Sequence, residues 1–186
     1  MNFNKHSNLE GLHALLGASQ YHWIFYDEEK LISYVKNIDA KARGTELHEF
    51  AATCIRLKQK LPRTKDTLNM YVNDAIGFRM TPEQVLYYSE NCFGTADTIC
   101  YHDGILRIHD YKSGTVPAKI EQLMIYSALF FLEYGIDPAK TETHLRIYQN
   151  NDILPCDPNP DEIKTFMDTI VRSDEIVKKV KFNERG

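Results

Sequence analysis

The residues with the clearest chemical potential are two carboxylates, Asp97 and Asp110, on either side of an Asp103-Gly104 pair. Asp-Gly between two β-rich apolar runs is typical of a two-residue hairpin turn, and such a turn places Asp97 directly opposite Asp110. Their Cβ atoms would lie about 5 Å apart, on a face that is otherwise apolar. Like charges at that separation are destabilising unless something neutralises them. A divalent cation would do so, because Mg²⁺ and Mn²⁺ prefer carboxylate oxygens.

Lys112 follows Asp110 by two residues, so the alternation of a strand places both on the same face. Its ammonium could orient or deprotonate a water there, or stabilise a pentavalent phosphate. Spacing alone leaves a second interpretation open, in which Asp97 bends to solvent and Asp110 simply pairs with Lys112. The first interpretation predicts a hydrolytic metal centre, and the second an ordinary ion pair.

Further motifs around this pair resemble, in order and spacing, the RecB-like branch of the PD-(D/E)XK nuclease superfamily. The branch carries an upstream histidine motif, then Gly-x-x-Asp, a strand ending in Asp-x-Lys, and Gln-x-x-x-Tyr on the next helix. The matching segments are Gly44–His48, Gly94–Asp97, Asp110–Lys112 and Gln122–Tyr126. Phage and prophage proteins of this branch have a similar opening, matched by His13–Ser19 with Trp23, and a similar run at Phe93–Asp97.

The resemblance implies a ligand set for the metal: His48, Asp97, Asp110 and the main-chain carbonyl of Tyr111. A neutral imidazole suits Mn²⁺ better than Mg²⁺, so we expect manganese to support activity at least as well as magnesium. Many members of the branch have another glutamate in the strand before the Gly-x-x-Asp motif.

The candidates for that upstream glutamate are Glu90 and Glu83, of which Glu90 is nearer to the motif in sequence. Neither is counted among the ligands, and the smaller upstream set argues against a firmly held second metal.

The same resemblance assigns the catalytic residues. Asp97 and Asp110 hold the metal, Lys112 is the catalytic lysine, and Gln122 and Tyr126 line the site and help to hold DNA or the lysine. The i, i+4 spacing of the last two residues places both on one face of a helix.

The function implied is that of a metal-dependent DNA nuclease, an Mg/Mn-dependent deoxyribonuclease that leaves a 5′-phosphate and a 3′-hydroxyl. We expect an exonuclease of phage or prophage recombination or DNA processing, with DNA and a phage recombination protein as partners and room for homo-oligomers. Two alternatives stay open: a catalytically inactive DNA-binding or assembly protein on the nuclease fold, and a metal phosphoesterase that acts on nucleotides.

The composition limits how nucleic acid could be held. The chain has 186 residues, 26 of them acidic and 22 basic, for a formal net charge of −4. Binding through bulk positive charge is therefore excluded, and any affinity must be local. A basic run from Arg56 to Lys65 is either a solvated face or a track for a DNA backbone.

The same composition bears on the compartment. No segment approaches the roughly 20 apolar residues of a membrane span, and the first residues lack a signal-peptide core, so a cytoplasmic protein is expected. The four cysteines are scattered without a Cys-x-x-Cys pair, which favours buried, reduced thiols.

These residues need a scaffold, and the hydrophobic periodicity predicts one. Helices are expected over 27–40, 44–60, 65–77, 117–134 and 161–179, and strands over 85–88, 93–102, 105–112 and 143–149. This order indicates a single α/β domain with a mixed central β-sheet flanked by helices. The resemblance makes it a restriction-endonuclease-like core over residues 1–186, with 1–43 as a helical N-terminal extension.

Overall fold

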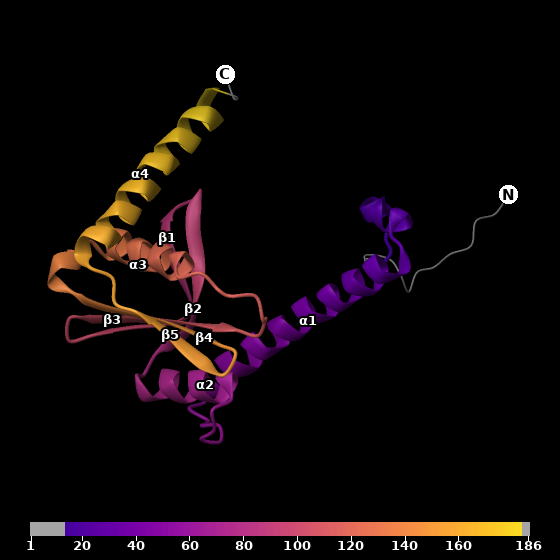
Figure 1. Cartoon of the computed structure of the whole chain (residues 1–186). Coiled ribbons are helices and arrows are strands. Elements are labelled where there is room, and N and C mark those ends of the chain that lie inside the picture. Colours follow the sequence, from indigo (N-terminus) through magenta and orange to yellow (C-terminus); the bar gives the residue numbers. More distant parts are fainter. Residues whose placement is uncertain (1–13, 184–186) are drawn as a thin grey trace. The chain divides into compact units, whose positions relative to one another are not determined.

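A computed structural model describes residues 14–183 of the chain (Figure 1); His13, the first residue of the opening motif, lies outside the described residues. The chain divides after Arg43 into two compact units, and each is described by itself. In the first unit the 3₁₀-helix η2 (Ala18–Phe25) precedes the long helix α1 (Glu28–Arg56), which continues into the second unit. Trp23 of η2 donates its indole N–H to the Gly17 carbonyl at 3.1 Å.

The second unit contains a five-stranded sheet in the order β1-β2-β3-β4-β5. Its strands are β1 (Thr81–Ser89), β2 (Cys92–His102), β3 (Ile105–Lys112), β4 (Glu142–Gln149) and β5 (Asp152–Cys156). Only β3 and β4 are parallel among these neighbours, so the sheet is mixed. The predicted fold class, an α/β unit with a mixed sheet flanked by helices, is confirmed.

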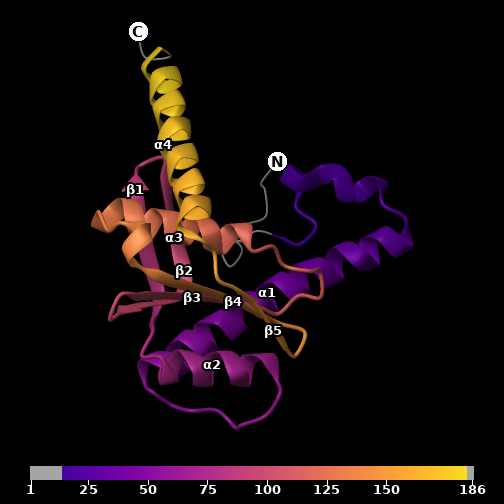
Figure 2. The same ribbon diagram turned by 60° about the vertical axis from the view of Figure 1, so that its left-hand side comes forward.

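Helices cover both faces of this sheet (Figure 2). One face packs against α3 (Glu121–Tyr134) and α4 (Pro160–Asn183) through a core that includes Leu106 and Ile108. The other face packs against α2 (Thr67–Gly77) and the C-terminal turns of α1, with Tyr111 in that core. Both faces of β3 are therefore buried, whereas the sequence indicated only one buried face.

The β2–β3 hairpin forms as predicted. Asp103 and Gly104 have φ angles of 54° and 76°, the two positive values that a type I′ turn requires and that Asp-Gly tolerates. The predicted register is observed from His102 opposite Ile105 to Thr98 opposite His109. The pairing of the two strands ends there, one residue before Asp97 and Asp110.

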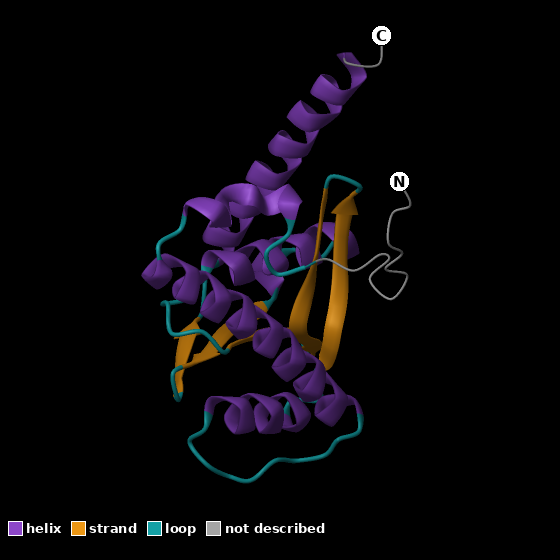
Figure 3. Cartoon of the chain, turned by 90° about the vertical axis from the view of Figure 1, so that its right-hand side faces the viewer, coloured by secondary structure: helices purple, strands orange, loops and turns teal. Residues whose placement is uncertain are grey.

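Strand alternation is interrupted in β2 beyond this point. Ile99 and Ala96, three residues apart, both pack in the core beneath α3, although strict alternation would put them on opposite faces. In the paired strand, Glu83 has a φ angle of 53°. Beyond the interruption, β1 and β2 run away from the other strands as a long pair (Figure 3). Regular alternation along β2 is therefore not observed between Ala96 and Ile99.

Helix α1 is one continuous helix where the sequence predicts two, over 27–40 and 44–60. The only break signal between them is Gly44. A single glycine costs about 1 kcal/mol in a helix interior and does not end the helix without a cap or a proline.

The end of α1 lies at Arg56 rather than at residue 60. Lys58 adopts a left-handed φ of 55°, and the Gln59 amide donates to the Cys54 carbonyl at 2.8 Å. This is the bonding of a Schellman motif, in which glycine usually occupies the left-handed position. A lysine there leaves no stop signal in the sequence.

Helix α3 begins at Glu121 and not at Pro117. The preceding segment is held by the side chain of Gln149, which accepts the Ala118 amide at 3.0 Å and donates to the Val116 carbonyl at 2.8 Å. A tertiary contact therefore replaces the first predicted turn of the helix.

Strand β5 (Asp152–Cys156) is absent from the prediction. It pairs antiparallel with β4 after a turn in which Asn150 and Asn151 have φ angles of 53° and 59°. Pro155 lowers the strand signal, yet proline is tolerated because β5 is an edge strand.

The cysteines are free thiols, as expected. Cys54 and Cys100 are buried, while Cys92 and Cys156 are only partly buried.

The core beneath α3 should dominate the stability of the second unit. Leu106 is completely buried in it, whereas Leu57 is 68% exposed. We expect Leu106→Ala to lower the free energy of unfolding by about 2–5 kcal/mol, through lost transfer energy and a residual cavity. The matched change Leu57→Ala should stay within about 0.5 kcal/mol. Urea denaturation followed by circular dichroism compares the two, and equal losses would contradict this packing.

Candidate active site

Three carboxylates lie in one row across β1, β2 and β3. The register of β1 with β2 sets Glu83 opposite Asp97, and extending the β2–β3 register by one residue sets Asp97 opposite Asp110. Two of the three were predicted as a pair. For the third, the sequence left Glu90 and Glu83 open and counted neither as a ligand; Glu90, the nearer in sequence, lies in the β1–β2 turn and lines a different cavity.

His48 of α1 lies beside the central carboxylate. Its Nδ1 atom is 3.2 Å from Asp97 Oδ2, and the same oxygen accepts the Tyr111 amide at 3.0 Å. The hydrogen bond to Asp97 raises the pKa of His48 against the opposing effect of burial. Asp97 therefore does not bend to solvent, because its side chain is only 15% exposed.

Glu83 completes a group with these two residues. One ligand atom each from His48, Glu83 and Asp97 lies within 4.8 Å of the other two. Sequence spacing gave little reason to choose Glu83, because strand alternation is interrupted at its position.

Asp110 is held by a second chain of contacts. Lys112 Nζ donates to Asp110 Oδ1 at 3.1 Å and to Gln122 Oε1 at 3.0 Å. Gln122 in turn donates to the Tyr126 hydroxyl at 3.1 Å. The i, i+4 pair on α3 thus positions the lysine, as the motif implies.

The surroundings of Gly94 explain why the Gly-x-x-Asp motif has a glycine at this position. A Cβ atom at this position would lie 2.9 Å from Tyr126 Cε1, closer than side chains approach one another. Any other residue would displace the Tyr126 ring and so disturb the hydrogen bond between Gln122 and the Tyr126 hydroxyl.

The surroundings of Asp110 disfavour its ionised form. It is 1% exposed, and burial, followed by the nearby charge of Asp97, raises its pKa to about 6 against the opposing effect of Lys112. The ammonium is 2.9 Å from Oδ2, yet this buried oxygen receives no hydrogen bond from the described residues. Such an atom gains from a further cation or proton nearby.

The site opens into a cavity of about 470 Å³ along one face of α1. His48 and Glu83 line it, together with Arg56 from the last turn of the helix. Arg56 therefore lines the same cavity as His48 and Glu83, where its guanidinium could contact a phosphate. Of the remaining basic run, Lys60, Arg63 and Lys65 line a separate cavity beside α2.

The donor set fits a small divalent cation in part. Bonds of 2.0–2.1 Å in octahedral geometry put neighbouring ligand atoms roughly 3 Å apart and opposite ones roughly 4.2 Å apart. The 3.2 Å separation of His48 Nδ1 and Asp97 Oδ2 matches a neighbouring pair, and the group with Glu83 needs only a small contraction.

The predicted ligand set is thus divided in this structure. His48 and Asp97 lie together and gain Glu83, whereas Asp110 is paired with Lys112. Tyr111 contributes an amide donor to Asp97. The structure therefore contains the Asp110–Lys112 ion pair that one interpretation of the sequence predicts. It also contains a cluster of possible metal ligands, as the other interpretation predicts.

No model of a known protein family matches the chain, and none of the curated proteins with which it was compared matches it. Between residues 14 and 183, no helix combines the length and the apolar composition that crossing a membrane requires.

The Asp97 contact can be tested through the pKa of His48. In metal-free protein, we expect a His48 pKa above 6.5, since the Asp97 hydrogen bond favours the imidazolium. Asp97→Asn should lower it, because burial is then opposed by less negative charge. Histidine resonances followed by NMR across pH measure both. His109 is the internal control: burial holds its pKa at about 3, and that value should not move. A wild-type His48 pKa below 6.5 would contradict the contact.

Proposed function

We propose that this protein is a metal-dependent deoxyribonuclease that hydrolyses phosphodiester bonds. The observation that carries the proposal is the buried Asp110–Lys112 pair beside the group of His48, Glu83 and Asp97. Buried like charges are costly, and an ordinary structural site would gain nothing from keeping them together. A site that works on phosphate esters uses both halves.

Each half has a distinct task. A divalent cation held by His48, Glu83 and Asp97 would supply charge neutralisation for a phosphate oxygen and a bound water of lowered pKa. Asp110 anchors the ammonium of Lys112, which is then placed to hold an attacking water or a phosphate oxygen by hydrogen bonding.

Residues around the pair would orient it. Gln122 shares the Lys112 ammonium with Asp110, and Tyr126 fixes Gln122. Arg56, which lines the cavity, would bind a phosphate of the DNA strand through the planar set of N–H donors on its guanidinium group. The guanidinium supplies this contact locally, which is how a chain of net charge −4 can bind a polyanion.

The biological setting in this proposal follows the sequence resemblance alone. An exonuclease of phage or prophage recombination or DNA processing would act in the cytoplasm of the bacterial host, on DNA ends and beside a recombination partner. Manganese and magnesium are the cations that the donor types favour.

Cleavage assays test the catalytic half directly. Wild-type protein should degrade DNA in the presence of Mn²⁺ or Mg²⁺, and loss of linear but not circular substrates would identify an exonuclease. Asp110→Ala and Lys112→Ala should each lower the rate at least 100-fold, since Lys112 supplies the ammonium that faces the reacting phosphate and Asp110 holds that ammonium in place. Asp168→Ala and Lys164→Ala, at exposed positions of α4, are matched controls and should retain full activity. The proposal would be refuted if the wild-type protein had no activity, or if Asp110→Ala and Lys112→Ala were as active as the wild type.

Cation binding should depend on pH through His48. A proton on the imidazole competes with the cation, and the His48 pKa is raised above its ordinary value. Mn²⁺ affinity in calorimetric titrations should therefore fall as pH is lowered from 8 to 6, by up to about tenfold per unit. His48→Gln should weaken binding at pH 8 and flatten this dependence. Affinity that is unchanged by pH, or by the substitution, would remove His48 from the ligand set.

A further inference from the structure

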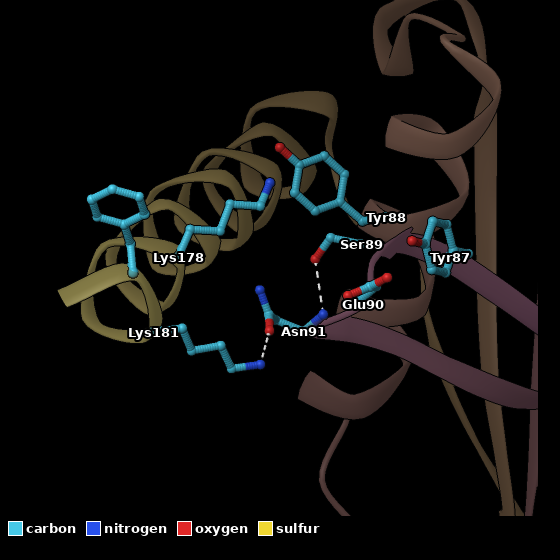
Figure 4. A pocket seen from close by; sticks show the side chains of 8 residues that line it. Tyr87, Tyr88, Ser89, Glu90, Asn91, Lys178 and Lys181 are labelled. Atoms are coloured by element: carbon cyan, nitrogen blue, oxygen red, sulfur yellow. Dashed lines mark hydrogen bonds between the residues drawn. The ribbon is translucent and has the colours of Figure 1, made fainter. Parts of the chain in front are cut away.

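A second cavity, of about 560 Å³, lies where the β1–β2 turn meets the C-terminal turns of α4 (Figure 4). Tyr87 and Tyr88 line it from β1, and Lys178, Lys181 and Phe182 line it from α4. The cavity therefore combines aromatic rings with ammonium groups, and none of its residues takes part in the carboxylate site.

The buried carboxylate of Asp174 lies beneath these lysines and pairs with Lys178. Asp174 of α4 is only 3% exposed, and its Oδ1 atom accepts the Ser89 hydroxyl at 2.6 Å and the Asn91 side-chain amide at 2.9 Å. Lys178 Nζ lies 2.7 Å from Oδ2. Hydrogen bonds from Lys178, Ser89 and Asn91 hold the pKa of Asp174 well below its usual range, so the carboxylate stays charged.

The second lysine is held by the same network. Lys181 donates to the Oδ1 atom of Asn91, whose amide group is bound to Asp174. An ammonium has three N–H donors, so each lysine keeps donors for a further acceptor beyond these contacts. Both cations are thus pre-positioned, which reduces the ordering cost of binding an anion.

The aromatic part of the cavity is unusually exposed. Phe182 is 80% exposed and Tyr87 47% exposed. Figure 4 shows Tyr88 beside Lys178, and Phe182 lines the same cavity from α4. Glu90 is the only carboxylate among the lining residues that the structure describes, and it disfavours a ligand that offers negative charge alone.

The cavity is connected to the carboxylate site along β1. Exposed side chains alternate from Glu83 through Val85 to Tyr87, and the exposed Phe93 lies opposite Tyr87 on β2. At about 3.3 Å per residue, Tyr87 is roughly 13 Å along the strand from Glu83. The β1–β2 pair therefore extends from the carboxylates to the residues of the cavity.

We propose that this cavity binds a nucleotide of single-stranded DNA, with the base stacked on its aromatic rings and the phosphate on Lys178 and Lys181. Stacking on aromatic side chains together with cationic contacts to the backbone is how proteins hold single strands. Bases within a duplex are already stacked, which favours the single strand. The ligand class rests on the proposed function, but the binding itself needs neither metal nor cleavage.

The test is the fluorescence anisotropy of a labelled ten-nucleotide thymidine strand, measured with the full chain in EDTA. Lys181→Gln and Phe182→Ala should each weaken binding about 5- to 10-fold, while Lys164→Gln, the same charge change elsewhere on α4, should not. An abasic strand of equal length should bind wild type as weakly as the thymidine strand binds Phe182→Ala. Lys181→Gln should also lower the slope of log K against log salt by about 0.7.

Several outcomes would overturn the inference: equal binding of abasic and thymidine strands, unchanged affinity in both cavity variants, or tighter binding of duplex. Sedimentation with phosphatidylserine vesicles that is lost in Phe182→Ala, without any DNA binding, would assign the surface to membranes instead. Failure here is separable from failure of the proposed nuclease. Strand binding in EDTA without cleavage in Mn²⁺ refutes only the nuclease, and cleavage that is insensitive to the cavity variants refutes only the second site.

Discussion

The burial of one carboxylate constrains the whole site. Asp110 lies in a central strand with helices on both faces of the sheet, and an ionised group there needs a cation close by. Lys112 supplies it from the same strand, and Gln122 and Tyr126 of α3 fix the direction of the lysine. The strand order, the position of α3 and the absence of a side chain at Gly94 can all be understood as conditions for keeping this charge in place.

Much of the scaffold was readable from local signals. The Asp103-Gly104 turn fixed the register of β2 and β3 because few dipeptides accept two positive φ angles. The missing information was tertiary: Lys58 takes the left-handed position at the end of α1 without any glycine to mark it. In the same way, Gln149 holds the segment before α3 from a strand far along the chain.

The sequence named most residues of the candidate site, but it did not predict which three side chains form the ligand cluster. The motif correctly brought His48 to Asp97 and Lys112 to Gln122. It did not select Glu83, because the alternation of β1 and β2 is interrupted where they diverge from the sheet. A period-two pattern cannot anticipate that interruption, because the pattern assumes unbroken alternation along each strand.

Two buried carboxylates, Asp110 of β3 and Asp174 of α4, differ in their electrostatic surroundings. Burial and the charge of Asp97 raise the pKa of Asp110, whereas abundant donors lower the pKa of Asp174. Asp110 is paired with Lys112 and lies near the charge of Asp97, whereas Asp174 accepts hydrogen bonds from Ser89 and Asn91 in addition to its contact with Lys178. Because the chain has a net charge of −4, its electrostatic interaction with any anion depends on the position of each local charge more than on the total.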